Sequence, residues 1–272
     1  MRSVPAVQRA AWPDLGGAFT FLEQVYAVAE ADARKLRHDP VILLTRAVQP
    51  ALWLLVFGQV FARIRGVPTG SLSYLDFMAP GILAQSSLFI AIFFGISVIW
   101  ERDLGILHKF LASPAPRVAL VLGKACAAGI RGIAQALIVY LLALVLRVDV
   151  RPDLFAVVGV FLCVALGSAV FATFSLVMAC LVRDRERLMG FGQVLTMPLF
   201  FASNAIYPIS LMPGWLQVIS GVNPLTYQID ALRTLMINGA TSVFSVPLDV
   251  GIQVLFLAAL VWLAARLYPR VV

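Results

Sequence analysis

Residues 77–100 read FMAPGILAQSSLFIAIFFGISVIW and contain no charged side chain. A helix needs about 20 apolar residues to cross the hydrocarbon core of a bilayer, so this stretch is long enough to span a membrane. Backbone polar groups cannot stay unpaired in lipid, which favours a helix for this stretch. The next segment, ERDLGILHKFLASPAPR at 101–117, changes abruptly to charged residues and prolines. The chain is therefore expected to leave the membrane near Trp100.

The whole chain has the composition of a membrane protein. Hydrophobic residues make up 61% of its 272 residues, charged residues only 13%, and the mean hydropathy is +0.93. Soluble domains carry about 25% charged residues, so much of this surface must face lipid. We expect an all-α polytopic membrane protein with six transmembrane helices, at residues 41–62, 77–100, 126–146, within 154–182, 188–207 and 248–268. Pro50 should kink the first of these helices.

The N-terminal segment, residues 1–40, is expected to lie outside the spans as a cytoplasmic segment. From Phe19 onward apolar residues recur every three or four positions, while the charged residues fall elsewhere on the helical wheel. This pattern predicts an amphipathic helix that lies along the membrane interface. The alternative is an ordinary surface helix. Residues 41–272 then form the transmembrane domain.

The distribution of basic residues predicts the orientation. They concentrate before the first span, after the second and fourth spans and at the C-terminus, and they are fewer on the other side. The side that is richer in Lys and Arg is normally cytoplasmic, so both termini are predicted to be cytoplasmic. Arginine far outnumbers lysine, which favours a GC-rich bacterium and hence a bacterial plasma (inner) membrane.

The residues between the fifth and sixth predicted spans are too apolar for an ordinary loop. Prolines divide them into two pieces, and each piece is too short to cross a bilayer. Asn223 followed by Pro224 is a favourable helix start, because Asn caps the first turn and Pro already has a helical φ. We expect two short re-entrant helices on the extracellular side, with Trp215 and Tyr227 at the membrane interface.

The segment after the second span is the best candidate for contact with a partner. It combines an apolar stripe with charged neighbours and a glycine. The stripe is Leu104, Leu107 and Leu111, the charged neighbours are Glu101 and Arg102, and the glycine is Gly105. A rigid amphipathic helix outside the membrane can transmit the motion of a docked protein. The alternative is an interfacial helix without a partner.

Polar side chains within the predicted spans are candidates for a substrate pathway or a dimer interface. A charged side chain is costly in lipid and should face protein or water. Hydrogen bonding between helices would equally explain polar residues at these positions. The candidates are Gln85, Arg131, Gln135, Gln193 and Asn204.

The sequence offers no catalytic site and no metal site. Its one Gly-Lys pair, Gly123-Lys124, lacks the flanking residues of a phosphate-binding loop. His38 and His108 stand alone, so neither a metal ligand set nor a catalytic triad is expected. The net charge of +7 is spread over short clusters between apolar runs, which argues against nucleic acid as a partner. The lipid membrane is the partner that the composition requires.

Two motifs stand out along the chain. The first is Glu101-Arg102-x-x-Gly105-x-Leu107, continued by Leu111-x-x-Pro114 and Gly123-Lys124; the second is Pro213-x-Trp215-Leu216 with Asn223-Pro224-Leu225-Thr226-Tyr227. In this order and between these spans, the motifs resemble permeases of the type-2 ATP-binding-cassette (ABC-2) exporter family. The resemblance implies a homodimer or a pair of related permeases, bound to two cytoplasmic ATP-binding-cassette ATPase subunits. It also implies that residues 101–111 form a coupling helix, and that ATP and Mg²⁺ bind to the ATPase.

Residues and resemblance together predict a permease subunit that moves an amphipathic drug, lipid or glycan outward and has no ATPase site of its own. A membrane-embedded lipid-modifying enzyme or assembly factor is one alternative. It would need clustered carboxylates or histidines, whereas the acidic residues are scattered. An ion-coupled transporter is another alternative. Buried acidic residues are typical of that class, and the second, fourth and fifth predicted spans contain none.

Overall fold

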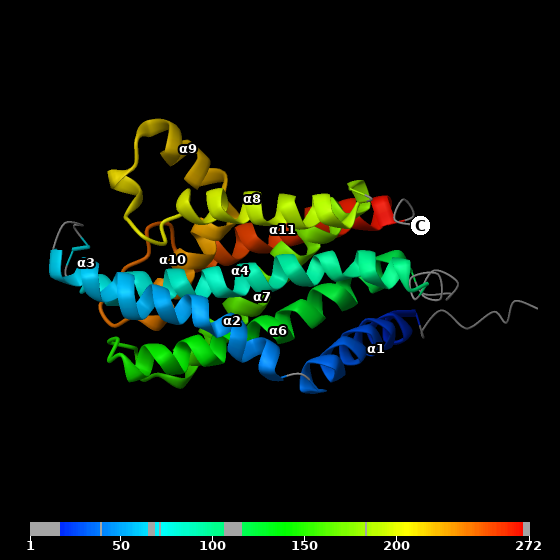
Figure 1. Cartoon of the computed structure of the whole chain (residues 1–272), viewed down its shortest axis with the longest axis horizontal. Helices are drawn as coiled ribbons and strands as arrows, with labels where there is room; N and C mark the ends of the chain where they lie inside the picture. Colours follow the sequence, from blue (N-terminus) through cyan, green and yellow to red (C-terminus); the bar gives the residue numbers. More distant parts are fainter. Residues whose placement is uncertain are drawn as a thin grey trace, which may run out of the picture.

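The computed structural model describes residues 17–38, 40–64, 69–70, 72–105, 116–182 and 184–268. These residues form a bundle of α-helices (Figure 1). Among these residues, Val150 and Ile237 form an isolated antiparallel β-bridge. The all-α class expected from the sequence is therefore confirmed.

Four of the described helices are long and apolar enough to cross a membrane. They are α4 (Tyr74–Asp103), α6 (Arg117–Val145), α7 (Leu154–Leu181) and α11 (Val246–Leu267). The central helix is α4, whose most apolar stretch is 83% buried, against 22% for α11. It runs through the middle of the bundle and packs against α6, α7, α8 and α10 (Figure 1). Any force on α4 is therefore passed to most of the bundle.

One helix boundary differs from the expected one. Helix α6 begins at Arg117, well before residue 126, and Pro116 lies in an extended conformation just before it. Lys124, which looks like a loop residue in a hydropathy profile, is buried in the bundle. Helix α7 lies within residues 154–182, the stretch that was expected to contain the fourth span. Its first turn is capped by Asp153, which accepts a hydrogen bond from the N–H of Phe155 at 3.3 Å.

The two other predicted spans are interrupted or shorter. Residues 40–64 are helical throughout, as α2 (Pro40–Leu52), the π-helical turn η1 (Trp53–Gly58) and α3 (Gln59–Ile64). The π-helical turn follows Pro50, which has no N–H to donate and crowds the preceding turn. Helix α8 (Arg185–Phe201) has 17 residues, fewer than the about 20 that a span needs. Within the described part of the chain, length and composition alone thus identify four spans, and the arrangement with six stays a prediction.

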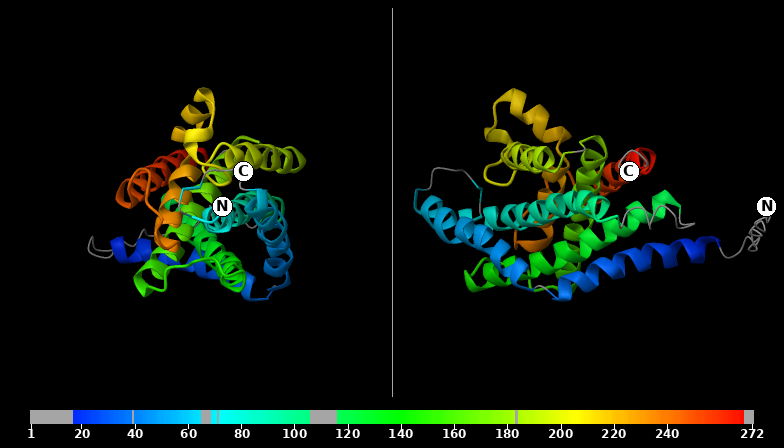
Figure 2. Two further views of the ribbon diagram at one scale, coloured as in Figure 1. Left: turned by 90° about the vertical axis from the view of Figure 1, so that its left-hand side faces the viewer. Right: turned by 45° about the vertical axis from the view of Figure 1, so that its right-hand side comes forward.

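Helix α1 (Gly17–His38) lies beside α6 (Figure 2). Val28 and Ala29 are buried, and Val28 is so close to Gly123 of α6 that a Cβ there would clash. Leu22 and Tyr26, on the apolar side of the helix, are exposed. An exposed apolar surface of this kind suits contact with lipid, so the interfacial position stays a prediction.

The connection between α8 and α11 contains short helices, as the prolines predict. They are η2 (Ile209–Leu211), α9 (Gly214–Val222) and α10 (Pro224–Met236). Helix α9 projects from the bundle, whereas α10 packs against α4, α7 and α11 (Figures 1 and 2). Leu225, Ile229 and Leu232 of α10 have no exposed surface. Helix α10 is therefore part of the core.

Candidate functional site

A buried ion pair joins the end of α4 to α6. The Nζ of Lys124 lies 2.7 Å from Oε1 of Glu101, and each residue is only 6% exposed. Both charges are removed from water, and their pairing offsets part of the cost of desolvation. Glu101 therefore lies inside the bundle and fixes the last turn of α4 against α6.

Two cations of α6 flank one aromatic ring of α4. The Nζ of Lys124 lies 5.6 Å from the centroid of the Phe94 ring, and the guanidinium carbon of Arg131 lies 4.6 Å from it. Lys124 and Arg131 are two helical turns apart, as are Phe94 and Glu101, so these side chains follow one seam between α4 and α6. Arg131 packs on protein at this seam, and its part in a pathway stays a prediction.

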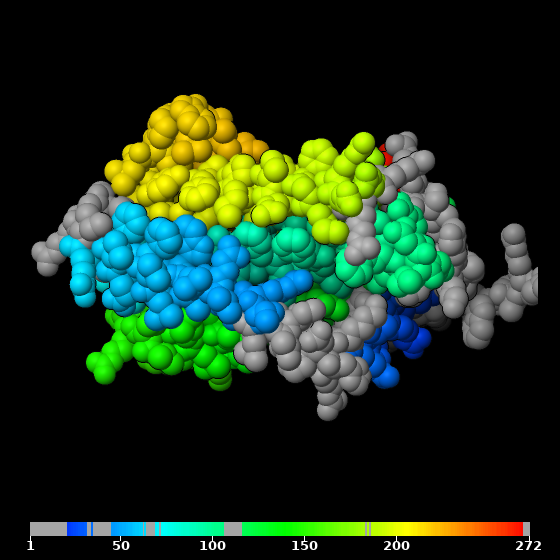
Figure 3. All heavy atoms as spheres, viewed as in Figure 1, coloured from blue at the N-terminus to red at the C-terminus, as the bar shows by residue number. Residues whose placement is uncertain are grey.

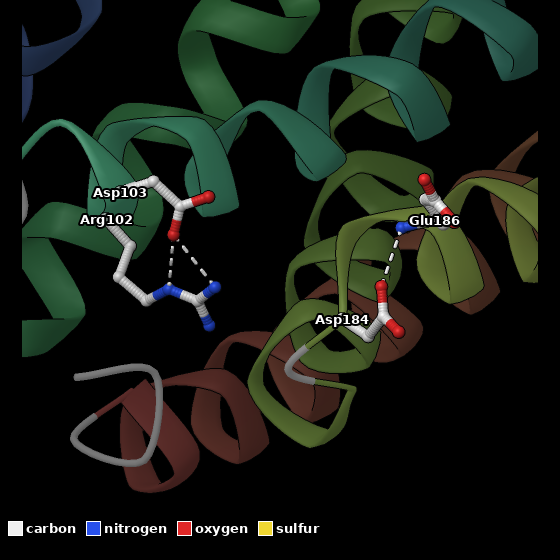
Figure 4. A network of polar contacts seen from close by, with 4 residues as sticks. All are labelled: Arg102, Asp103, Asp184 and Glu186. Carbon is white, nitrogen blue, oxygen red and sulfur yellow. Dashed lines mark hydrogen bonds and ion pairs between the residues drawn. The ribbon is translucent and has the colours of Figure 1, made fainter.

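Other charged residues at this end of the bundle are less buried. The Nε and Nη2 of Arg102 donate to Oδ1 of Asp103 at 3.0 and 2.9 Å, so the guanidinium turns back to its neighbour (Figure 4). Asp184 accepts a hydrogen bond from the N–H of Glu186 at 3.0 Å and so caps α8 (Figure 4). Charge is thus presented at the end of α4 and at the start of α8, where a partner could reach it.

Helix α4 ends in a turn that favours glycine. Gly105 has a φ of +71°, a left-handed conformation that costs other residues about 1–2 kcal/mol. Its N–H donates to the carbonyl of Arg102 at 2.9 Å. Among the described residues a Cβ at Gly105 would meet nothing within 4 Å, so the preference for glycine that they show comes from the backbone conformation. Leu104 is 74% exposed, whereas Leu107 and Leu111 lie outside the described residues.

Asn223 joins the start of α10 to α8. Its Oδ1 accepts a hydrogen bond from the N–H of Leu225 at 3.0 Å, and its Nδ2 donates to the carbonyl of Leu199 at 2.7 Å. Pro224 occupies the first position of α10. The helix start predicted from Asn-Pro is therefore confirmed, and the same side chain also holds two elements together.

The two aromatic residues expected at the membrane interface differ in position. Tyr227 is 8% exposed, and its hydroxyl donates to the carbonyl of Gly221 at 2.6 Å. Its ring lies 5.1 Å from the ring of Phe244. Trp215, in contrast, is 67% exposed on α9. Of these two residues, Trp215 is the one with the surface to reach a headgroup region.

Arg233 and Asp230 of α10 are structural anchors that hydropathy does not single out. The Nη2 of Arg233 donates to the carbonyls of Asn204 at 2.6 Å and Phe77 at 3.2 Å. Burial lowers the pKa of Arg233 to about 10, so the guanidinium stays charged at neutral pH. Asp230 accepts a hydrogen bond from the N–H of Val243 at 2.9 Å. An acid and a base one turn apart in an apolar helix are the signal that could have found them.

The polar residues predicted within the spans do not gather at one place. Gln85, Gln135 and Asn204 are at most 2% exposed and lie on α4, on α6 and after α8, whereas Gln193 is exposed on α8. Each of the three buried residues has at least one amide atom without a hydrogen-bond partner in the described part of the chain. Such atoms are uncommon and call for an explanation, such as water or a ligand. The described residues contain no group of three His, Cys, Asp or Glu side chains that could hold a metal ion.

Membrane-length apolar helices with charged groups near their ends define a multi-pass membrane protein. Residues 23–237 match the model of the ABC-2 type transporter family, and the chain belongs to this family. The ycf38 protein of Cyanophora paradoxa, which is named a transport permease, is 30% identical over 80% of this chain and 76% of its own length. The daunorubicin resistance ABC transporter permease protein DrrB1 of Streptomyces coeruleorubidus is 27% identical over 85% of this chain and 81% of its own length. Nodulation protein J of Neorhizobium galegae is 25% identical over 73% of this chain and 75% of its own length.

Membership of this family defines the class of function. The chain is the permease component of an ABC-2 exporter, and permease subunits of this family lack an ATPase domain of their own. The resemblance seen in the two sequence motifs is therefore confirmed. The relatives carry names as different as drug resistance and nodulation, so family membership does not fix the substrate.

Proposed function

We propose that this chain is the membrane subunit of an ATP-driven exporter that moves an amphipathic drug, lipid or glycan outward across a bacterial plasma membrane. ATP and Mg²⁺ bind to a separate cytoplasmic ATP-binding-cassette ATPase, and this chain binds no cofactor. A second copy of the permease, or a paralogue, completes the pathway. The observation that carries the proposal is the rigid junction between the membrane helices and residues 101–105, held by Glu101 and Lys124.

A coupling element must move the membrane helices when its partner moves. The Glu101–Lys124 pair fixes the last turn of α4 to α6, and α4 is the most enclosed of the membrane-length helices. A displacement of the segment that follows α4 would therefore act on the centre of the bundle. In this proposal Glu101 is a positioning residue, and the ATPase is contacted by Arg102, Leu104, Leu107 and Leu111.

Replacement of Gly105 by valine is expected to weaken docking of the ATPase. A β-branched residue resists the left-handed backbone that Gly105 adopts, so the chain would leave α4 in another direction. We expect a loss of about 1–2 kcal/mol in the free energy that holds the segment in place. Co-purification of the permease with its cognate ATPase, and substrate-stimulated ATP hydrolysis in proteoliposomes, measure the effect.

Gly105→Asn is the matched control, because asparagine tolerates the left-handed region far better than valine. It should retain docking and export. Full docking by both variants would remove the coupling role of this turn. Loss of docking in both would assign the role to the absence of a side chain and not to the backbone.

We propose six spans, with residues 40–64 and α8 as the first and fifth. At 1.5 Å per residue, residues 40–64 extend about 37 Å and α8 about 25 Å, against about 30 Å of hydrocarbon. The ends of α4 and α11 and the starts of α6 and α8 lie at one end of the bundle, and α9 lies at the other (Figure 1). The basic residues favour the first of these ends as the cytoplasmic one.

Cysteine labelling of intact cells tests this orientation. Thr241 is exposed in the segment before α11, and Arg187 is exposed at the start of α8. In a background without the native cysteines, Thr241→Cys should react with an impermeant maleimide, and Arg187→Cys should react only after the membrane is permeabilised. Reaction of Arg187→Cys alone in intact cells would invert the topology.

The helices on one face support contact with a second permease. Helix α4 is visible between α2 and α8 on this face (Figure 3). Gln49 of α2 and Gln193 of α8 are exposed, and apolar residues precede and follow each of them along its helix. Polar side chains are costly against lipid, so protein or water is the expected environment of these residues.

A further inference from the structure

A cavity of about 340 Å³ lies between α2 and α4. Ligand pockets are typically about 300–1,000 Å³, so the cavity can hold the headgroup of a small amphiphile. Its lining includes Arg46 and Gln49 from α2 and Gln85, Phe89 and Phe93 from α4. It lies in the part of the bundle that is expected to be within the membrane. Two amides and a guanidinium at this depth need an explanation.

The cavity presents hydrogen-bond donors for which the described residues supply no acceptor. The guanidinium carbon of Arg46 lies 5.7 Å from the centroid of the Phe93 ring, and among the described residues no carboxylate forms an ion pair with it. Gln85 is 2% exposed, and its Nε2 has no hydrogen-bond partner in the described part of the chain. A guanidinium has donors only. The group that completes this cavity is therefore an acceptor, and a negative charge fits best.

The depth of Arg46 indicates where such a group comes from. Arg46 lies about 9 Å along the helix axis from Pro40, the first residue of α2. In the proposed orientation the end of α4 is cytoplasmic, and Arg46 packs on Phe93, about 15 Å along the helix axis from Asp103 at that end, so Arg46 lies below the headgroups of the cytoplasmic leaflet. Phe89 and Phe93 supply an apolar wall beside it. A lipid-like molecule could place its charged end at Arg46 without leaving apolar surroundings.

We propose that this cavity binds the anionic headgroup of an amphiphile drawn from the cytoplasmic leaflet, with Arg46 as the cation and Gln85 as a second donor. The substrate class is thereby narrowed to amphiphiles that carry a phosphate or carboxylate. The proposal rests on the proposed function in two respects, namely that the chain is a permease and that the end of α4 is cytoplasmic. Binding itself requires neither ATP nor the ATPase, so it can be tested separately from transport.

Photolabelling of the full chain in phosphatidylcholine vesicles tests the proposal. Two trace probes are compared, phosphatidic acid and phosphatidylcholine, each with the same diazirine-bearing acyl chain. Adducts on residues 40–64 and 74–103 should form with phosphatidic acid at about tenfold higher yield, the ratio expected for one charge-assisted hydrogen bond. Arg46→Gln should remove the preference. Gln85→Glu should also remove it, because its carboxylate would compete for Arg46 in the same cavity.

Arg266→Gln is the matched control. Arg266 also lies over an aromatic ring, 3.8 Å from the centroid of Trp262, but it does not line the cavity, and its loss should leave the preference unchanged. Equal labelling by both probes, or an unchanged preference in Arg46→Gln and Gln85→Glu, would overturn the proposal. Dissociation of a dimer in Arg46→Gln with the preference retained would instead place Arg46 at a subunit interface. Competition by free inorganic phosphate would show that the ligand is the ion and not a lipid.

Failure of transport is distinguishable from failure of this proposal. If the headgroup preference holds while no export of any amphiphile is observed with the ATPase present, the proposed function is wrong and the binding site stands. If export occurs and the headgroup preference is absent, the site is wrong and the exporter stands.

Discussion

Alanine at Glu101 or at Lys124 should lower the stability of the permease by about 3–5 kcal/mol, because each single change breaks a buried ion pair by removing one of its two charges. The two side chains are 2.7 Å apart and almost without exposed surface. The last turn of α4 would lose its attachment to α6, so export should fall with stability. Thermal unfolding of the purified chain and substrate-stimulated ATP hydrolysis by the reconstituted complex measure the two effects.

The double variant Glu101→Leu/Lys124→Met tests whether the junction needs the two charges or only two side chains that fill the space. Replacing a buried ion pair by apolar side chains is often neutral or stabilising, so most of the stability should return. Arg187→Ala is the control, because Arg187 and Asp184 form an ion pair at 3.4 Å with side chains 77% and 52% exposed. Such a pair contributes about 0–1 kcal/mol. A double variant as unstable as the single ones, or a fully stable Glu101→Ala, would contradict the role of the junction.

Hydropathy was sufficient to locate the long helices because lipid imposes length and composition on them together. Helices α4, α7 and α11 begin and end within a few residues of the predicted positions. The start of α6 was not predictable in this way. Lys124 resembles a loop residue until its partner is known, and that partner, Glu101, belongs to another helix. Hydropathy contains no information on such pairing.

The candidate site was predictable only where a residue has a local backbone role. Gly105 and Asn223 stood out because glycine and asparagine have local backbone roles, and the structure gives both such a role. Arg233 was missed because its acceptors are backbone carbonyls of Phe77 and Asn204, which no side-chain pattern shows. The cavity beside Arg46 was missed because it exists only where α2 packs on α4.

Gly81→Val should cause the second large loss of stability. The loss should be on the order of 3 kcal/mol, because the valine side chain would overpack the contact. A Cβ at Gly81 would lie 2.7 Å from the carbonyl oxygen of Ala205 and 2.8 Å from its Cα. Both are backbone atoms, so no rotation of a side chain can relieve the clash. The neighbouring carbonyl of Asn204 binds Arg233 at 2.6 Å. A shift of this backbone would therefore also weaken the attachment of α10 to α4.

Gly251→Ala is the matched control for this glycine, because a Cβ at Gly251 of α11 would meet no described residue within 4 Å. Alanine should be neutral there or stabilise the helix by up to about 1 kcal/mol. The midpoint of thermal unfolding and the yield of folded permease compare the two variants. Equal midpoints would mean that α4 and Ala205 are not in close contact in the membrane. A lower midpoint for Gly81→Val alone would establish that α4, α10 and the segment after α8 are held together at one contact.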